Sequence, residues 1–209
     1  MSDGVQHHDH GRTFQPDIED SPYSIHQLMA EALERLLIEK GVFTPEALRR
    51  QIELQDSLTP AQGSALVANA WVDPSFRQHL LEDVNGAAEA VGIKAGDIPI
   101  RAVENTVDLH NVIVCTLCSC YPRQLIGLPP DWYKSKSYRS RAVVEPRAVL
   151  KEFGTEVPDN VTVRVHDSNA DMRYLVLPKQ PEGTEDWPAE KLAEIVSRDA
   201  MVGVVLPEA

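Results

Sequence analysis

The sequence predicts an α+β protein, in which helices come first and a mixture of strands and helices follows. Apolar residues recur every three or four positions through the first part of the chain, which is the period of an amphipathic helix. Short β-branched runs begin near residue 96 and alternate with further helical patterns. All three cysteines lie between Cys115 and Cys120, so the second part of the chain is expected to carry a chemical site.

The pattern divides the chain into a tail of residues 1–20, a helical N-terminal arm of residues 21–95 and an α+β domain of residues 96–209. The tail is polar and lacks apolar periodicity, so we expect it to be disordered. Its histidines are candidates for loose metal binding, although a solvated tail or a remnant of cloning is the simpler explanation. They are His7, His8 and His10.

The helices expected in the arm each open with a short polar residue followed by proline, which is a common start signal. These starts are Ser21-Pro22, Thr44-Pro45, Thr59-Pro60 and Asp73-Pro74. The last of these helices is expected to end at Gly92. The first is amphipathic and is followed by a loop, so we expect it either to pack on another subunit or to dock on its own domain.

Beyond residue 96, β-branched runs predict strands and apolar periodicity predicts helices. Strands are expected at 98–103, 111–114, 161–165 and 174–177. Helices are expected at 131–144, at 146–153 and from 188 to about 200. The strand at 111–114 leads directly into the cysteines, so its end is where a site would form.

Composition is that of an ordinary globular protein, with 43% hydrophobic and 25% charged residues. The formal net charge of -12 argues against a nucleic-acid partner, because such a surface repels phosphate. No apolar run is long enough to cross a bilayer, and no signal peptide opens the sequence. We therefore expect a soluble, cytoplasmic protein that binds neither membrane nor nucleic acid.

The cysteine segment runs Val114-Cys115-Thr116-Leu117-Cys118-Ser119-Cys120. A disulfide between Cys115 and Cys118 would close a very small loop and stabilise little. Metal or redox chemistry is the better interpretation of such clustering. The sulfurs of all three cysteines and the main-chain nitrogens of Ser119 and Cys120 can reach one ion and leave one octahedral position open, as a catalytic metal requires.

A main-chain amide binds a metal only after it loses its proton, which favours a strongly Lewis-acidic ion such as trivalent cobalt or iron. The zinc alternative combines the three cysteines with His110 or His166, but zinc sites usually divide their ligands between distant segments. A reactive thiol cluster without metal is the remaining alternative. From the residues alone, these three interpretations stay open.

Several segments resemble the α subunit of nitrile hydratases and the homologous metal-bearing subunit of thiocyanate hydrolases. They are Ala70–Pro74, Val114–Pro122, Gly127–Lys134, Tyr138–Arg141, Arg173–Pro178, Gly183–Thr184 and Arg198–Met201. The run from Cys115 to Cys120 is the most specific of these. The resemblance implies a layered α-β-β-α domain behind the helical arm, and a β-type subunit paired across the active site.

The resemblance also implies the state of the site. It implies one Co(3+) per chain, with Cys118 as sulfinic acid, Cys120 as sulfenic acid and Cys115 as an unmodified thiolate. Thr116 resembles the cobalt-type members, whereas iron-type members tend to carry serine there. An activator protein is expected to load the metal. Cys115, Cys118, Ser119 and Cys120 are thus the expected metal ligands.

The activity implied is hydration of a small nitrile to its amide, with Cys118, Ser119 and Cys120 as the catalytic residues. One departure from the cobalt nitrile hydratases is Arg123, where those enzymes often have tryptophan. An arginine bordering the pocket favours a polar or anionic substrate. At this position the chain resembles thiocyanate hydrolases, which convert thiocyanate to carbonyl sulfide and ammonia. Arg123 is equally well explained by a salt bridge to another subunit. A non-catalytic zinc-binding subunit is the third alternative.

Other residues near the motif carry weaker expectations. Tyr133 and Tyr138 are expected to pack rather than to contact substrate. Arg141 is expected to tie the cysteine loop to a helix or to face the partner subunit, as is Arg139. Glu104 and Asn105 are candidates for hydrogen bonds behind the metal ligands.

Overall fold

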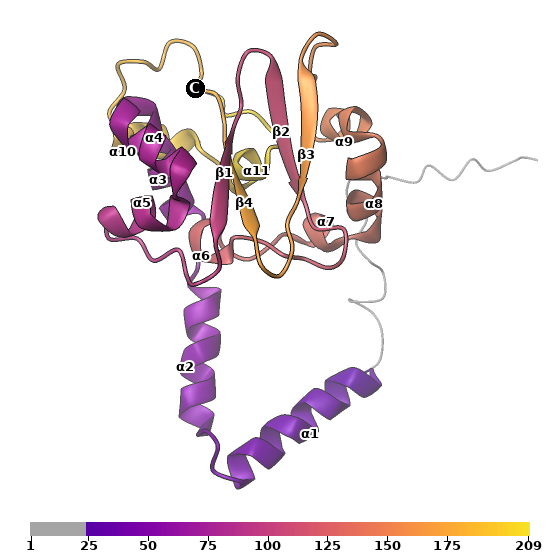
Figure 1. Ribbon diagram of the computed structural model, residues 1–209. Coiled ribbons are helices and arrows are strands. Elements are labelled where there is room, and N and C mark those ends of the chain that lie inside the picture. Colours follow the sequence, from indigo (N-terminus) through magenta and orange to yellow (C-terminus); the bar gives the residue numbers. More distant parts are fainter. Residues whose placement is uncertain (1–23) are drawn as a thin grey trace, which may run out of the picture.

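The computed structural model describes residues 24–209 (Figure 1). The expected tail of residues 1–20, its histidines and Ser21 lie outside the described residues. The first helix, α1 (Ile25–Glu39), begins after Ser24, whose side chain accepts from the Gln27 N–H in a capping box. Helix α2 (Pro45–Asp56) begins after Thr44 as predicted, and neither helix contains a buried residue. Both helices project from the body of the molecule (Figure 1).

Three shorter helices follow the projecting pair: α3 (Ala61–Val72), α4 (Pro74–Glu82) and α5 (Val84–Ala90). Asp73 caps α4 as predicted, because its carboxylate accepts from the N–H groups of Ser75 and Phe76. The prediction of one helix continuing to Gly92 is wrong. The chain leaves the helical conformation at Asp83, whose carboxylate accepts from the Gly86 N–H and starts α5.

The predicted strands are all present, with bounds shifted by one or two residues. They are β1 (Ile100–Glu104), β2 (Leu109–Val114), β3 (Thr162–Asp167) and β4 (Arg173–Leu177). They form two parallel two-stranded sheets, one of β1 and β4 and the other of β2 and β3. The register pairs Val114 with Asp167 and Ile100 with Arg173. Residues that lie far apart in the sequence therefore meet at two places, where β2 and β3 end and where β1 and β4 begin.

The remaining helices are short. They are α6 (Arg123–Ile126), α7 (Asp131–Lys134), α8 (Lys136–Val144), α9 (Pro146–Glu152), α10 (Ala189–Ile195) and α11 (Arg198–Val202). The predictions of one helix over 131–144 and one over 188–200 are wrong. Ser135 interrupts the first, because its hydroxyl accepts from the Tyr138 N–H, and Ser197 interrupts the second by accepting from the Ala200 N–H.

The elements stack in an α-β-β-α order, as expected (Figure 1). Helices α3, α4, α5 and α10 lie beside the sheet of β1 and β4, and helices α8 and α9 lie beside the sheet of β2 and β3. The core between the layers contains Leu66, Ile113, Leu125 and Leu175, none of which is exposed. No helix within residues 24–209 combines the length and the apolar character that a membrane span requires.

Candidate metal centre

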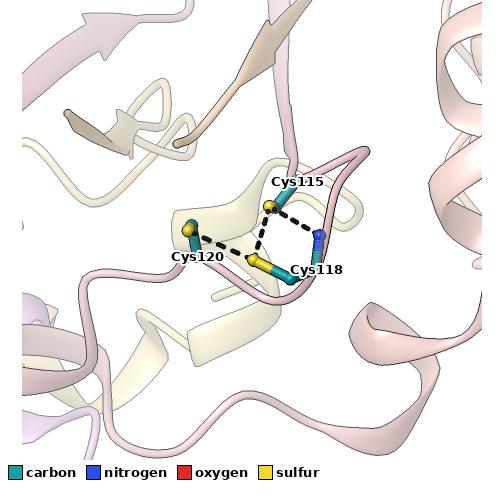
Figure 2. A group of neighbouring side chains, drawn as sticks. All are labelled: Cys115, Cys118 and Cys120. Carbon is teal, nitrogen blue, oxygen red and sulfur yellow. Dashed lines mark hydrogen bonds between the residues drawn. The ribbon is translucent and has the colours of Figure 1, made fainter. Parts of the chain in front are cut away.

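The cysteines lie on the loop that follows β2, and their sulfur atoms converge (Figure 2). Cys115 comes directly after the buried strand and is itself fully buried, whereas Cys118 is exposed and Cys120 is partly exposed. The sulfur of Cys118 lies 3.6 Å from that of Cys115 and 3.5 Å from that of Cys120. All three sulfurs lie within 4.8 Å of one another. The predicted cluster therefore forms, with a buried sulfur at one end and accessible sulfurs at the other.

The main chain of the loop folds around the buried sulfur. The Cys118 N–H donates to the Cys115 sulfur over 3.2 Å (Figure 2). This bond fixes the turn directly before Ser119 and Cys120, whose main-chain nitrogens are the predicted nitrogen ligands. Ser119 and Cys120 follow at once and line the same opening as Cys118. Soft sulfur donors and adjacent amide nitrogens are the set predicted to suit a trivalent ion.

Asp167, the last residue of β3, binds the beginning of the loop through two hydrogen bonds to Thr116, which we call the clasp. One of its carboxylate oxygens accepts from the Thr116 N–H over 2.9 Å, and the other accepts from the Thr116 hydroxyl over 2.6 Å. The next residue, Ser168, donates its N–H to the Val114 carbonyl over 2.7 Å. The parallel pairing of β2 with β3 thus continues into the loop and fixes the point at which it leaves the sheet.

Two buried tyrosines hydrogen-bond the main chain on either side of the cysteines, one at the loop and one at strand β2. The Tyr133 hydroxyl donates to the Cys120 carbonyl over 2.9 Å, and the Tyr138 hydroxyl donates to the Ile113 carbonyl over 2.6 Å. Burial raises the pKa of both phenols above their usual range, so both remain protonated donors. The rings contact each other and Trp132, which agrees with the expected packing role. Their hydrogen bonds add a second role that the sequence did not predict.

The thiols of Cys118 and Cys120 differ in acidity. The hydrogen bond from Cys120, together with the Ser119 main chain, lowers the pKa of Cys118 below its usual value. Burial, and then the neighbouring Cys118 sulfur, raise the pKa of Cys120 to about 12. Of these two thiols, Cys118 therefore loses its proton first, and a nearby cation would favour the second charge on Cys120.

The open side of the cluster faces a cavity of about 500 Å³. Cys118, Ser119 and Cys120 form part of its wall, together with the predicted pocket residue Arg123. Arg173, at the start of β4, and Asp97, which precedes β1, also line it. The cavity is large enough for a small organic molecule beside the sulfurs.

The histidines proposed for zinc lie elsewhere. His110 bonds the Gly203 carbonyl through Nε2 over 2.8 Å, and His166 bonds the Asn111 side chain through Nε2 over 2.9 Å. Burial is the main cause that lowers the pKa of each, so both are neutral near pH 7. Among residues 24–209, the metal-competent group contains the three cysteines and no histidine. This geometry does not support the zinc alternative with either of them.

Three residues with weaker expectations make contacts away from the metal ligands. Arg141 pairs with Glu145 and Glu152 and so joins α8 to α9. Glu104 pairs with Arg77, and the Asn105 side chain accepts from the Asn111 N–H over 2.7 Å. The loop contacts made by Asp167 and the cavity position of Arg173 were missed. The available signal was proximity to a predicted strand, since Asp167 follows the strand expected at 161–165 by two residues and Arg173 directly precedes the strand expected at 174–177.

A family model described as "Nitrile hydratase, alpha chain" matches residues 24–205. The chain belongs to this family. It is a family of enzymes, hydro-lyases, so the prediction that the chain is part of an enzyme is confirmed. The family resemblance inferred from the cysteine motif is confirmed as well.

Three relatives illustrate the range of the family. The α subunit of the high-molecular-weight cobalt-containing nitrile hydratase of Rhodococcus rhodochrous is 47% identical over 186 residues, which cover 87% of this chain and 91% of the relative. A solved thiocyanate hydrolase with partially modified cobalt centres is 41% identical, with a TM-score of 0.83 and coverage of 90% of this chain and 92% of that chain. A double mutant of the Fe-type nitrile hydratase from Comamonas testosteroni Ni1 is 40% identical, with a TM-score of 0.82 and coverage of 90% and 93%.

Proposed function

We propose that this chain is the metal-carrying catalytic subunit of a cobalt nitrile hydratase, which adds water to a nitrile and forms the amide. The observation that carries the proposal is the convergence of three sulfurs within 4.8 Å at the wall of a cavity. Family membership and the cobalt-containing relative at 47% identity support the same activity.

The residues present fit a trivalent metal. The sulfurs of Cys115, Cys118 and Cys120 would hold Co(3+), together with the main-chain nitrogens of Ser119 and Cys120. When bound, the ion supplies Lewis acidity that polarises a nitrile or lowers the pKa of a water molecule. Thr116 agrees with the cobalt-type pattern, and its hydroxyl is engaged by Asp167, so it acts on the loop and not on the cavity. Iron is the alternative ion, because an Fe-type relative has the same fold.

The three cysteines and Ser119 would have different roles in the reaction. Cys115, which is buried, would hold the ion from the protein side. Cys118 and Cys120 face the cavity, and we propose that they carry oxygen as sulfinic and sulfenic acid. The oxygen on Cys120 would attack the nitrile carbon or take a proton from the attacking water, while the nitrile nitrogen gains the two protons of that water. Ser119 would contribute its main-chain nitrogen and place its hydroxyl at the cavity wall.

Partners complete the proposal. The relative from Rhodococcus is one subunit of a larger enzyme, and we propose that this chain likewise assembles with a β-type subunit that closes the cavity. An activator protein would load the metal. The net charge of -12 supports the absence of a nucleic-acid partner, and we propose that the enzyme is cytoplasmic.

Thiocyanate is the second candidate substrate. Arg123 lines the cavity beside Cys120, and a guanidinium there would attract an anion more strongly than a neutral nitrile. The thiocyanate hydrolase at 41% identity supports this alternative. Its products would be carbonyl sulfide and ammonia.

The test begins with metal analysis and peptide mass measurement on the full chain, produced with cobalt and its β-type partner. We expect one cobalt per chain, two added oxygen atoms on Cys118 and one on Cys120. A panel of aliphatic nitriles, heteroaromatic nitriles and thiocyanate then separates the two candidates. Amide formation supports nitrile hydration, whereas carbonyl sulfide release with untouched nitriles would replace it with the second candidate. Stoichiometric zinc and unmodified thiols would remove both.

A further inference from the structure

Arg173 is a half-buried arginine with one fully buried donor atom. Its main-chain N–H donates to the Pro99 carbonyl over 2.9 Å at the start of β4, which fixes the residue at the end of the strand nearest the cluster. Its side chain lines the cavity together with Cys118, Ser119 and Cys120. The Nη1 atom is buried and has no hydrogen-bond partner among the described residues. A charged donor thus lies at the cavity wall with an unused proton.

An unused buried donor is costly, since it has lost water and gained no acceptor. Arg77 and Arg198 show the usual solution, because they pair with Glu104 and Asp199. The Nε atom of Arg139 is also buried without a partner within residues 24–209, but Arg139 does not line this cavity. Asp97 lines the same cavity but forms no salt bridge with Arg173. The exception therefore points to an acceptor that becomes available in the working enzyme.

Cys120 is the cavity side chain that offers such an acceptor once its sulfur carries oxygen. It is only partly exposed, whereas Cys118 is exposed and can be hydrated. Arg123 lines the same cavity, but its side chain is exposed and therefore already hydrated. Among the arginines that line this cavity in the described part of the chain, Arg173 is the one with a buried donor that has no partner.

We propose that Arg173 donates a hydrogen bond from Nη1 to the oxygen carried by Cys120, and that this bond positions the oxygen and preserves the sulfenic state. The inference rests on the proposed function, which places an oxygen on Cys120. A guanidinium and an anionic oxygen form a charge-assisted hydrogen bond, which is stronger than a neutral one. Arg173 is thus a positioning residue supplied by this chain itself.

The hydrogen bond preserves the sulfenic state because it makes the sulfur of Cys120 less nucleophilic. Further oxidation by hydrogen peroxide transfers one oxygen to the sulfur: S–O⁻ and H₂O₂ give SO₂⁻ and H₂O, with the sulfur lone pair forming the new bond and the O–O bond breaking. The sulfur is oxidised and the peroxide is reduced. A hydrogen bond at the existing oxygen withdraws density from that lone pair, so its loss accelerates the reaction.

The test compares the wild-type holoenzyme, Arg173→Met and Arg173→Lys during exposure to hydrogen peroxide. Arg101→Met is the matched control, because Arg101 lies on the neighbouring strand with an exposed side chain. Peptide mass measurement follows the gain of a second oxygen on Cys120. We expect Arg173→Met to gain it at least about tenfold faster than wild type, the order expected for loss of one hydrogen bond to a charged group. Arg173→Lys should fall between them, and Arg101→Met should match wild type.

The visible absorption of the bound cobalt provides a second readout, since a purely structural role would leave it unchanged. We expect the band to shift in Arg173→Met and to return toward wild type in Arg173→Lys. Equal oxidation rates and equal bands in wild type and Arg173→Met would overturn the inference. If Arg173→Met yields no holoenzyme, a wild-type rate and band in Arg173→Lys would overturn it instead. Wild-type protein without oxygen on Cys120 would remove the proposed function as well, so the two failures are distinguishable.

Discussion

Helices α1 and α2, the projecting part of the arm and called the arm from here on, are stabilised by different contacts from those of the cysteine loop. Helices α1 and α2 contain no buried residue, and Leu28, Met29 and Leu33 on α1 are each at least half exposed. The loop, by contrast, begins at a fully buried Cys115 and is bonded to β3 and to α7. The arm has its conformation from local signals such as the Ser24 capping box. The loop has its conformation from residues distant in the sequence.

The two regions therefore differ in the kind of contact that stabilises them, which is local in the helices and long-range in the loop. The hydrogen bonds that order the cysteine loop come from residues of this chain, namely Cys118, Asp167 and Tyr133. Apolar side chains of α1 such as Leu28, Met29 and Leu33 stay at least half exposed, so local signals specify the helix while part of its apolar surface is left uncovered by the chain. Changes in the loop should therefore affect metal binding strongly, and changes in the arm should not.

The largest expected effect comes from Cys115→Ala. Removal of the buried sulfur eliminates the ligand on the protein side, so we expect cobalt content near zero and activity reduced more than about 100-fold, beyond the usual effect of changing a residue behind a metal ligand. Cobalt analysis and activity measurement check this. Leu33→Ser in the arm is the matched control and should retain cobalt. Normal cobalt content in Cys115→Ala would break the comparison.

The next effect concerns the clasp at the start of the loop. Asp167→Ala removes the acceptor for both donors of Thr116, which frees the loop, and we expect cobalt affinity to fall about 10- to 100-fold. Competition with a chelator of known affinity measures it. Asp171→Ala is a suitable control, because Asp171 is an exposed carboxylate on the turn between β3 and β4. Equal affinities in the two variants would show that the clasp does not order the loop.

A smaller effect is expected below the loop. Tyr133→Phe keeps the aromatic packing but removes the donor to the Cys120 carbonyl. We expect the free energy of unfolding to fall by about 1 kcal/mol, the usual contribution of one hydrogen bond. Urea unfolding of the metal-free chain measures the change. An unchanged unfolding midpoint would mean that water replaces the hydroxyl without cost.

The smallest effect is expected in the arm. Leu33 is 55% exposed, so Leu33→Ser should change the free energy of unfolding of the isolated chain by less than about 0.5 kcal/mol. Leu66→Ala in the buried core should cost about 2–5 kcal/mol and is the contrasting variant. A loss of more than about 1 kcal/mol from the arm substitution would show that α1 is packed on its own domain in solution.

Sequence reasoning succeeded where the deciding interactions are local. Thr44 and Asp73 were identified as helix starts because each cap binds N–H groups within three residues. The breaks at Asp83, Ser135 and Ser197 were missed, although each is also made by a local cap, because the apolar period continues across them and was given more weight than the capping residue. The cysteine cluster was predicted because its ligands share one short segment. Asp167 and Arg173 were not, because the pairing of parallel strands brings them to the site and no sequence spacing encodes that pairing.

We propose above all that one short loop coordinates a trivalent ion through sulfur and main-chain nitrogen. X-ray absorption at the cobalt edge, recorded on the loaded full chain with its partner, tests this directly. We predict a shell of sulfur from Cys115, Cys118 and Cys120 together with a shorter shell of nitrogen, in six-coordinate geometry. A four-coordinate tetrahedral site, or a shell without nitrogen, would contradict the account.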